Sequence, residues 1–296
     1  MCGIGGVIYK KPGGNQRAGE VAYRILESIT RRGRDSVGVA LWQPNGGRLH
    51  VGVNYETPGL GPRIVAHLKA VGDAVEAEDG GGFVRATLGF TGGDEELVAG
   101  IEAIDPSVSV GAIGAHVEVL KALGDVANLE RAFHLTDYAG RVAIGLTRNA
   151  TESRVDFAHA QPLGVRGRRD VAIMHNGHIT NYLHLRERYK RRGHTFTTTN
   201  DSEVVGVVIA DRMAAGVSLD QALRFTQREI DGSMTYVVVT EAAVALVKDQ
   251  WAYKPMVVAE TDEFVALASD GEALANGFGR DVSFREPGAG EVLVWP

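Results

Sequence analysis

Short apolar runs separated by glycine are the feature that most restricts the fold of this 296-residue chain. Glycine accounts for 38 of the 296 residues, about 13% against a usual ~7%. The glycines are scattered between apolar runs such as 36–42, 83–90 and 234–240. Because glycine permits tight turns, this pattern predicts many short strands. Helical spacing of apolar residues in segments such as 20–31 and 202–215 predicts helices among them.

The chain has a strand-rich beginning and end with a different segment between them. Residues 1–54 and 141–296 are rich in strand signals, whereas residues 55–125 have strand and helix signals of their own. Within this middle segment, apolar spacing predicts a helix at 116–123. At roughly 100–200 residues per domain, the length allows one large domain or two modest ones. We expect one domain over residues 1–296, with an inserted subdomain at about 55–125.

Charge and composition restrict the partners and the compartment. The formal net charge is −6 without a basic block, which argues against nucleic acid, because phosphate binding needs clustered Lys and Arg. The single cysteine cannot form an internal disulfide, which suits a reducing cytoplasm. The N-terminus does not resemble a signal peptide, and no stretch reaches the ~18 apolar residues of a membrane helix. We therefore expect a cytoplasmic protein that binds neither nucleic acid nor membrane.

Cys2 is the first candidate for chemistry. Aminopeptidases remove Met1 when the second residue is small, and the mature chain would then carry a thiol and a free α-amino group on one residue. An α-amino group has a reference pKa of ~7.7–8.0, so it can accept the thiol proton near neutral pH. The alternative is that a lone cysteine is a small buried apolar residue. Its place at position 2, ahead of a Gly-Ile-Gly-Gly segment, favours the nucleophile.

Asn176 and Gly177 follow an apolar run at 171–174 and precede a predicted helix. Asn-Gly is a common turn dipeptide, so one interpretation is a β-turn. The other is an oxyanion hole, which needs a side-chain amide and a backbone N–H that point at one spot. Both donors are available from this pair.

Two charged residues are candidates for substrate binding. Arg148 follows a predicted strand and could hold a carboxylate by a bidentate contact, or lie in solvent at the strand end. Asp201 precedes a predicted helix and could bind an ammonium group. Alternatively, Asp201 or Ser202 is the N-cap of that helix.

Together these segments resemble the class II glutamine amidotransferases, a branch of the N-terminal-nucleophile hydrolases. The matching motifs occur in the family's order: Met-Cys-Gly-Ile at 1–4, Arg-Gly-Arg-Asp-Ser-Val-Gly at 32–38, Thr-Arg-Asn-Ala-Thr at 147–151, His-Asn-Gly-His-Ile-Thr-Asn at 175–181 and Asn-Asp-Ser-Glu-Val at 200–204. The resemblance implies an α+β fold, a four-layer αββα sandwich with two mostly antiparallel sheets, to which the inserted α/β segment is added.

The resemblance also implies a role for each matched residue. Cys2 attacks the side-chain amide of glutamine and forms a glutamyl thioester, while Asn176 and Gly177 stabilise the oxyanion. The substrate-binding residues are Arg148, which holds the α-carboxylate, Asp201, which holds the α-ammonium, and Thr151. Arg32 orders the surroundings of the nucleophile. Neither a metal nor a cofactor is implied.

The form of the motifs is closest to the glutamate-synthase-like branch, which includes amidotransferase subunits of the N-methylglutamate synthase type. Leu146 and Asn149 depart from the His and the aromatic residue that many relatives have there. We found neither an acceptor domain nor a Gly-rich phosphate loop in the sequence. We therefore expect ammonia to pass to a separate synthase subunit.

Two other interpretations remain open. An N-terminal-nucleophile amidohydrolase could act on a different amide, although the pair of Arg148 and Asp201 suits the two charged ends of an amino acid. A non-catalytic regulatory subunit is the second alternative, and the presence of Cys2, Asn176 and Gly177 argues against it.

Overall fold

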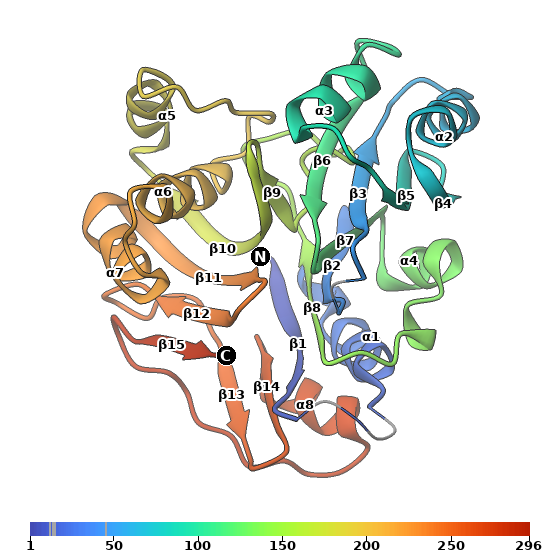
Figure 1. Cartoon of the computed structure of the whole chain (residues 1–296). Helices are drawn as coiled ribbons and strands as arrows, with labels where there is room; N and C mark the ends of the chain where they lie inside the picture. The colour runs from blue at the N-terminus through green and yellow to red at the C-terminus, as the bar shows by residue number, and fades with distance from the viewer. Residues whose placement is uncertain (12, 14–15, 45) are drawn as a thin grey trace.

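Two antiparallel sheets form the centre of the structure, a computed structural model that describes residues 1–11, 13, 16–44 and 46–296 (Figure 1). The first sheet has the strand order β13 (Val257–Glu260), β14 (Phe264–Ala268), β1 (Gly3–Tyr9), β8 (Val142–Arg148), β2 (Ser36–Trp42) and β7 (Val117–Leu123). The second has the order β15 (Val292–Trp295), β12 (Val244–Lys248), β11 (Gly232–Thr240), β10 (Arg168–Ile179) and β9 (Leu163–Val165).

Helices cover the outer face of each central sheet. The first sheet packs against α1 (Ala18–Ser28), α4 (Val126–Phe133) and α8 (Gly271–Phe278). The second packs against α5 (Tyr182–Lys190), α6 (Glu203–Ala214) and α7 (Leu219–Glu229), which lie outside β10 to β12 in Figure 1. Residues from both sheets form an apolar core between them. This order of layers confirms the predicted α+β fold, a four-layer αββα sandwich.

Strand β1 shows why both faces of the first central sheet are apolar. Successive side chains of a strand point to opposite faces, so Ile4 and Ile8 enter the core between the sheets while Val7 packs beside α1. Gly5 also faces α1, and a Cβ atom there would lie 2.4 Å from Ile25 Cγ2. The missing side chain therefore lets α1 approach the strand closely.

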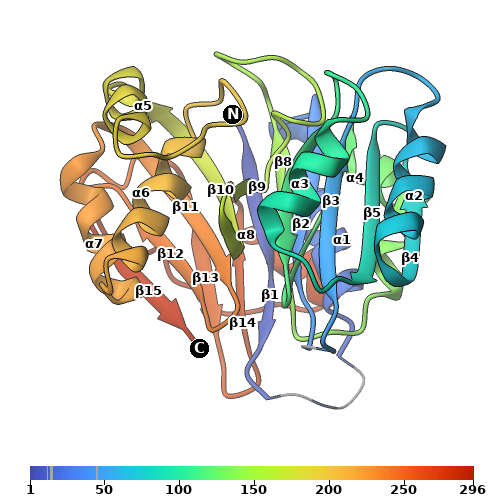
Figure 2. The ribbon, with the colours of Figure 1, turned by 45° about the horizontal axis from the view of Figure 1, so that its top comes forward.

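A third antiparallel sheet lies beside the sandwich, on the side of β7 and β9. Its order is β4 (Asp73–Asp79), β5 (Phe83–Gly89), β3 (Leu49–Asn54) and β6 (Ser109–Gly114), and α2 (Leu60–Val71) and α3 (Asp94–Glu102) pack on it (Figure 2). The insertion expected at about 55–125 overlaps this unit, but β3 lies outside those bounds and β7 belongs to the first central sheet. That the unit is an insertion into a larger domain stays a prediction.

The helix predicted at 116–123 is wrong, because this segment forms strand β7 at the edge of the first sheet. Glu118 and Lys121 have the spacing of a polar helix face, yet both are buried. Glu118 forms an ion pair with Arg85 of the third sheet, and this pairing explains a carboxylate inside a strand. Among the described residues, no helix is both long enough and apolar enough to cross a membrane.

Lys121 is buried within the protein at 1% exposure, and its Nζ donates to the carbonyl oxygen of Phe157 at 3.3 Å. Burial lowers the pKa of Lys121 to about 7, although the negative charges of Asp156 and Glu203 oppose the change. In the unfolded chain the pKa of a lysine is ~10.4. The unfolded chain therefore binds more protons than the folded chain between about pH 7 and pH 10.

We expect the effect of Lys121→Met on the free energy of unfolding to be more favourable at pH 7 than at pH 10. The cost of burying Lys121 is fully present below its folded pKa and is lost as the pH rises through its unfolded pKa. Denaturant unfolding at both pH values measures the difference. Lys69→Met, at an exposed lysine of α2, is the control for the loss of a positive charge at the surface. If the difference in the free energy of unfolding between Lys121→Met and the wild type does not change with pH, the lowered pKa of Lys121 is wrong.

Candidate active site

Cys2 lies directly before β1, at an end of the first sheet, where segments from both central sheets meet. Its Sγ is 3.7 Å from the carbonyl oxygen of Asn149, to which the thiol donates. Its own carbonyl oxygen accepts from Asn176 Nδ2 at 2.9 Å and from Arg32 Nε at 3.3 Å. The structure therefore brings together three of the residues that the sequence predicted to be catalytic.

The surroundings of the thiol favour its neutral form. Burial raises the pKa of Cys2, while the bond to Asn149 and the positive charge of Arg148 oppose the shift. A thiol with a raised pKa reacts only when a base removes its proton. The α-nitrogen of Cys2 lies in the peptide bond to Met1, which is 64% exposed at the surface. Removal of Met1 would release an α-amino group on the same residue as the thiol, and this amine is therefore the candidate base.

Arg32 belongs to a turn that packs on the end of β8. A Cβ atom at Gly33 would lie 2.4 Å from the carbonyl carbon of Arg148, so only glycine fits there. Asp35 follows: its N–H donates to the carbonyl oxygen of Arg148 at 3.0 Å, and its Oδ2 accepts from Ala150 N at 2.7 Å. The turn therefore fixes the position of the segment after Arg148, and Arg32 reaches Cys2 from it.

Asn176 and Gly177 lie inside β10, where they pair with Thr235 and Met234 of β11. The β-turn interpretation of this dipeptide is therefore wrong. A Cβ atom at Gly177 would lie 1.9 Å from the carbonyl oxygen of Ser233, so the strands could not pair in this way with a larger residue. The bond to Cys2 uses one N–H of the Asn176 amide, which has two.

Arg148 is buried at 2% exposure, so the interpretation as a solvent-exposed arginine at a strand end is wrong. Its Nη1 donates to the carbonyl oxygen of Arg154 at 2.9 Å and its Nη2 to Ser153 Oγ at 2.8 Å. These two bonds hold the loop between β8 and β9. A guanidinium has five N–H donors, so others remain for a substrate carboxylate.

Asp201 is buried at 3% exposure and connects the start of α6 to the end of β10. Its Oδ2 accepts from Ile179 N at 2.8 Å, and its Oδ1 accepts from the hydroxyl of Ser202 at 3.1 Å. Ser202 occupies the N-cap position of α6, as one interpretation expected, but its side chain makes no capping bond to the helix. The carboxylate of Asp201 therefore lies close in space to the end of β10 that carries Asn176, although the two are far apart in sequence.

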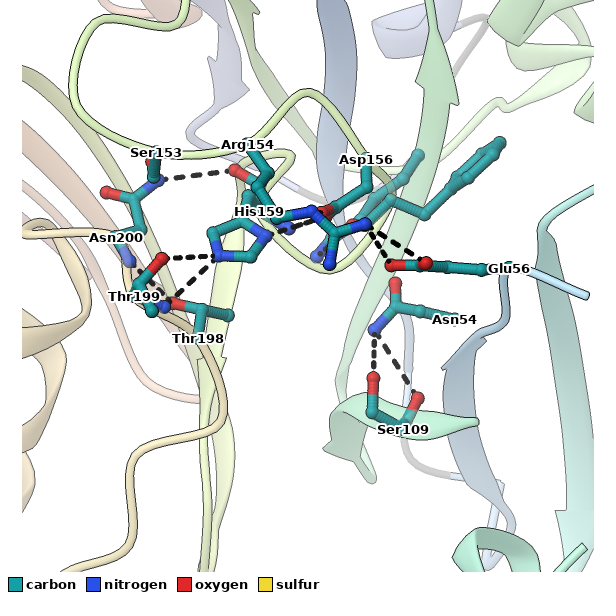
Figure 3. Close-up of polar contacts among 12 residues, drawn as sticks. Asn54, Glu56, Ser109, Ser153, Arg154, Asp156, His159, Thr198, Thr199 and Asn200 are labelled. Atoms are coloured by element: carbon teal, nitrogen blue, oxygen red, sulfur yellow. Dashed lines mark hydrogen bonds and ion pairs between the residues drawn. The ribbon is translucent and has the colours of Figure 1, made fainter. Parts of the chain in front are cut away.

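Thr151 lies on the exposed loop between β8 and β9. Its Oγ1 is 3.1 Å from His178 Nε2 and donates to Glu152 Oε2 at 2.5 Å. The loop also meets the segment that follows β3, where Arg154 forms an ion pair with Glu56 at 3.0 Å (Figure 3). Thr151 thus connects the loop to β10, two residues beyond Asn176.

A buried polar network behind these residues was not predicted. His175 donates its backbone N–H to Gln161 Oε1 at 2.6 Å, and its Nδ1 lies 2.8 Å from Ser202 Oγ. Gln161 Nε2 donates to the same hydroxyl at 3.1 Å. Burial lowers the pKa of His175. His175 and Ser202 lie in the quoted motifs, but no local pattern shows that they meet, because they come from segments far apart in the chain.

Comparison with known proteins agrees with this arrangement. A family model described as a glutamine amidotransferase domain matches residues 149–276. A provisionally named glutamine amidotransferase of Methanothermobacter thermautotrophicus is 35% identical over 91% of this chain and 92% of its own length. The glutamine amidotransferase-like protein GlxB of Rhizobium meliloti is 32% identical over 93% of this chain and 91% of its own.

A solved structure shows the same fold. Glutamine phosphoribosylpyrophosphate amidotransferase from B. subtilis superposes with a TM-score of 0.64 at 18% sequence identity. The match covers 99% of this chain and 47% of that one, so this chain spans about half the length of the B. subtilis enzyme. Fold, motif order and full-length relatives agree, and the chain belongs to the class II glutamine amidotransferases, a family of enzymes.

Proposed function

We propose that this protein hydrolyses the side-chain amide of glutamine to glutamate and ammonia, with Cys2 as the nucleophile. The observation that carries the proposal is the meeting of Cys2 with Asn176 and Arg32 at one end of the two sheets. Arg148 and Asp201 are held on the segments that follow β8 and precede α6. These are a nucleophile, an oxyanion donor and two opposite charges suited to an amino acid.

The chemistry begins once Met1 is removed and the α-amino group of Cys2 is free. This amine accepts the thiol proton, and Sγ attacks the amide carbon of glutamine. The second N–H of Asn176 and the N–H of Gly177 stabilise the oxyanion of the tetrahedral intermediate. The protonated amine then gives its proton to the leaving nitrogen, ammonia departs, and a glutamyl thioester remains. Water hydrolyses the thioester, which releases glutamate and restores the thiol.

Substrate recognition rests on the two charged ends of glutamine. The guanidinium of Arg148 holds the α-carboxylate, and the carboxylate of Asp201 accepts from the α-ammonium. Thr151 and Arg32 have supporting roles: Thr151 in the loop that covers the substrate, and Arg32 at the carbonyl of Cys2. An N-terminal-nucleophile hydrolase for a different amide would have less use for a buried cation and a buried anion near its nucleophile. The regulatory alternative leaves the placement of Cys2 unexplained.

We expect Cys2→Ala to abolish glutamine hydrolysis while the fold is kept. Because Cys2 is the only thiol, the glutamine analogue diazo-oxo-norleucine should label one site. Mass spectrometry of the peptides should place the label at the N-terminus, and intact mass should show that the active protein begins at Cys2. Full activity in Cys2→Ala, or in a protein that retains Met1, would refute the mechanism.

Substitutions of the binding residues and of the oxyanion residue should have different effects in steady-state kinetics, on KM and on kcat respectively. Loss of a buried charge contact typically costs about 2–5 kcal/mol, so Arg148→Ala and Asp201→Asn should raise KM for glutamine tens-fold or more. Asn176→Ala should instead lower kcat by ~10²–10³, because its bond to substrate forms mainly in the transition state. Thermal unfolding of each variant is the control for folding. An unchanged KM in both charge variants would leave Arg148 and Asp201 as structural residues.

We further propose that ammonia passes to a separate synthase subunit, of the glutamate-synthase-like kind. The two full-length relatives support this, because neither has the additional length of the B. subtilis enzyme. Free ammonia is mostly protonated at neutral pH and then no longer nucleophilic, so coupling to an acceptor preserves it.

Purification from the native host should therefore recover a synthase-like companion. Addition of that companion and its substrate should raise glutaminase activity several-fold, because closure of loops over the glutamine would complete the site. Glutamate release with and without the companion measures the effect. A fully active protein without such a companion would indicate a free-standing glutaminase, and a companion of an unrelated class would favour the regulatory alternative.

A further inference from the structure

His159 connects the two segments that carry the proposed substrate-binding charges. It lies on the loop between β8 and β9, is buried at 7% exposure, and points toward Thr199 (Figure 3). Its ring Nε2 is 3.1 Å from Thr199 N and 2.9 Å from Thr199 Oγ1. Its carbonyl oxygen accepts from Asn200 Nδ2 at 3.2 Å. Every one of these contacts falls on the two residues that precede Asp201.

Asp156 fixes the orientation of the imidazole. Its Oδ1 lies 2.7 Å from His159 Nδ1 and accepts from the backbone N–H of His159 at 2.8 Å. Burial alone would raise the pKa of Asp156, but these bonds hold it below its ordinary value. Because Nε2 accepts a backbone N–H, it carries no proton, and the proton of the neutral ring lies on Nδ1 toward Asp156.

The same loop is attached to Arg148 at its other end. Ser153 Oγ and the carbonyl oxygen of Arg154 accept from the guanidinium of Arg148. Lys121 Nζ donates to the carbonyl oxygen of Phe157, two residues before His159. The loop is therefore attached to Arg148 near its start and, through His159, to the residues before Asp201.

We propose that His159 is a positioning residue that fixes the separation between Arg148 and Asp201, and thereby the affinity for the two charged ends of glutamine. The proposal rests on the proposed function. A bound amino acid spans both charges, so each must stay at a set distance from the other. The imidazole supplies a rigid link because its two nitrogens are bonded on opposite sides, to Asp156 and to Thr199.

An alternative use of these residues is a second hydrolytic centre. The contacts of His159 with Asp156 on one side and with the hydroxyl of Thr199 on the other resemble a Ser/Thr-His-Asp triad. In such a centre the hydroxyl gives its proton to a free lone pair on Nε2. Here that lone pair already accepts the backbone N–H of Thr199. A shared lone pair suits a structural bond better than a general base.

Three variants distinguish these possibilities. His159→Leu removes all three contacts of the ring, to Asp156 and to the N–H and hydroxyl of Thr199. His159→Gln restores an acceptor for the N–H of Thr199 but not the bond to Asp156. Thr199→Val is the matched control, because it removes the hydroxyl and keeps the backbone N–H, at an exposed residue. Steady-state glutamine hydrolysis and hydrogen exchange of segment 198–201 are measured for each, together with thermal unfolding.

We expect His159→Leu to raise KM for glutamine about tenfold, as loss of roughly one buried hydrogen bond implies, with kcat changed less than about threefold. Exchange of segment 198–201 should become faster in the same variant. His159→Gln should fall between His159→Leu and the wild type in both measurements, and Thr199→Val should match the wild type. If His159→Leu does not fold, the intermediate values of His159→Gln carry the test.

Several outcomes would overturn the proposal. An unchanged KM or unchanged exchange in the His159 variants would show that the link does not position the charges. Equal losses in kcat and kcat/KM with constant KM would assign His159 to the chemical step. A Thr199→Val variant as impaired as His159→Leu would favour the hydrolytic centre. Absence of glutamine hydrolysis in the wild type would instead refute the proposed function, and exchange would still decide whether His159 holds the segment.

Discussion

Apolar packing between the two central sheets is the interaction on which the site depends. Strand β1 brings Cys2 to the end of one sheet, and β10 carries Asn176 in the other. Side chains such as Ile4 and Met174 fill the space between the sheets. Because this core fixes how the sheets face each other, it also fixes the 2.9 Å contact between Asn176 Nδ2 and the carbonyl of Cys2.

Close approach of backbone to backbone is the second constraint on the site. At Gly33 and Gly177 a side chain would collide with the carbonyl group of another segment, of Arg148 in one case and of Ser233 in the other. A collision with backbone cannot be relieved by a rotamer change. Both glycines therefore serve the geometry of the site even where they do not touch substrate, and this accounts physically for their place in the motifs.

Buried polar groups fix the position of segments that lie outside helices and strands. The loop between β8 and β9 is attached by Arg148, Lys121 and His159, each of which bonds a carbonyl or a neighbouring segment. Leaving any of these groups unpaired in the interior would cost more than the bond itself contributes. This asymmetry makes a buried network a rigid support for residues that must keep a set separation. His159 extends that support from Arg148 toward Asp201.

The sequence by itself determined the family, the layered α+β fold and the identity of the candidate residues, because the motifs at 1–4, 32–38, 147–151, 175–181 and 200–204 are local and ordered. Tertiary structure decided what each segment does. Asn-Gly reads locally as a turn, yet pairing with β11 keeps it inside a strand. Segment 116–123 has the local pattern of a helix but forms a strand. The sequence does not reveal this, because the burial of Glu118 and Lys121 depends on partners from other segments. The link through His159 is likewise invisible in sequence, since hydrogen bonds between distant segments leave no local pattern.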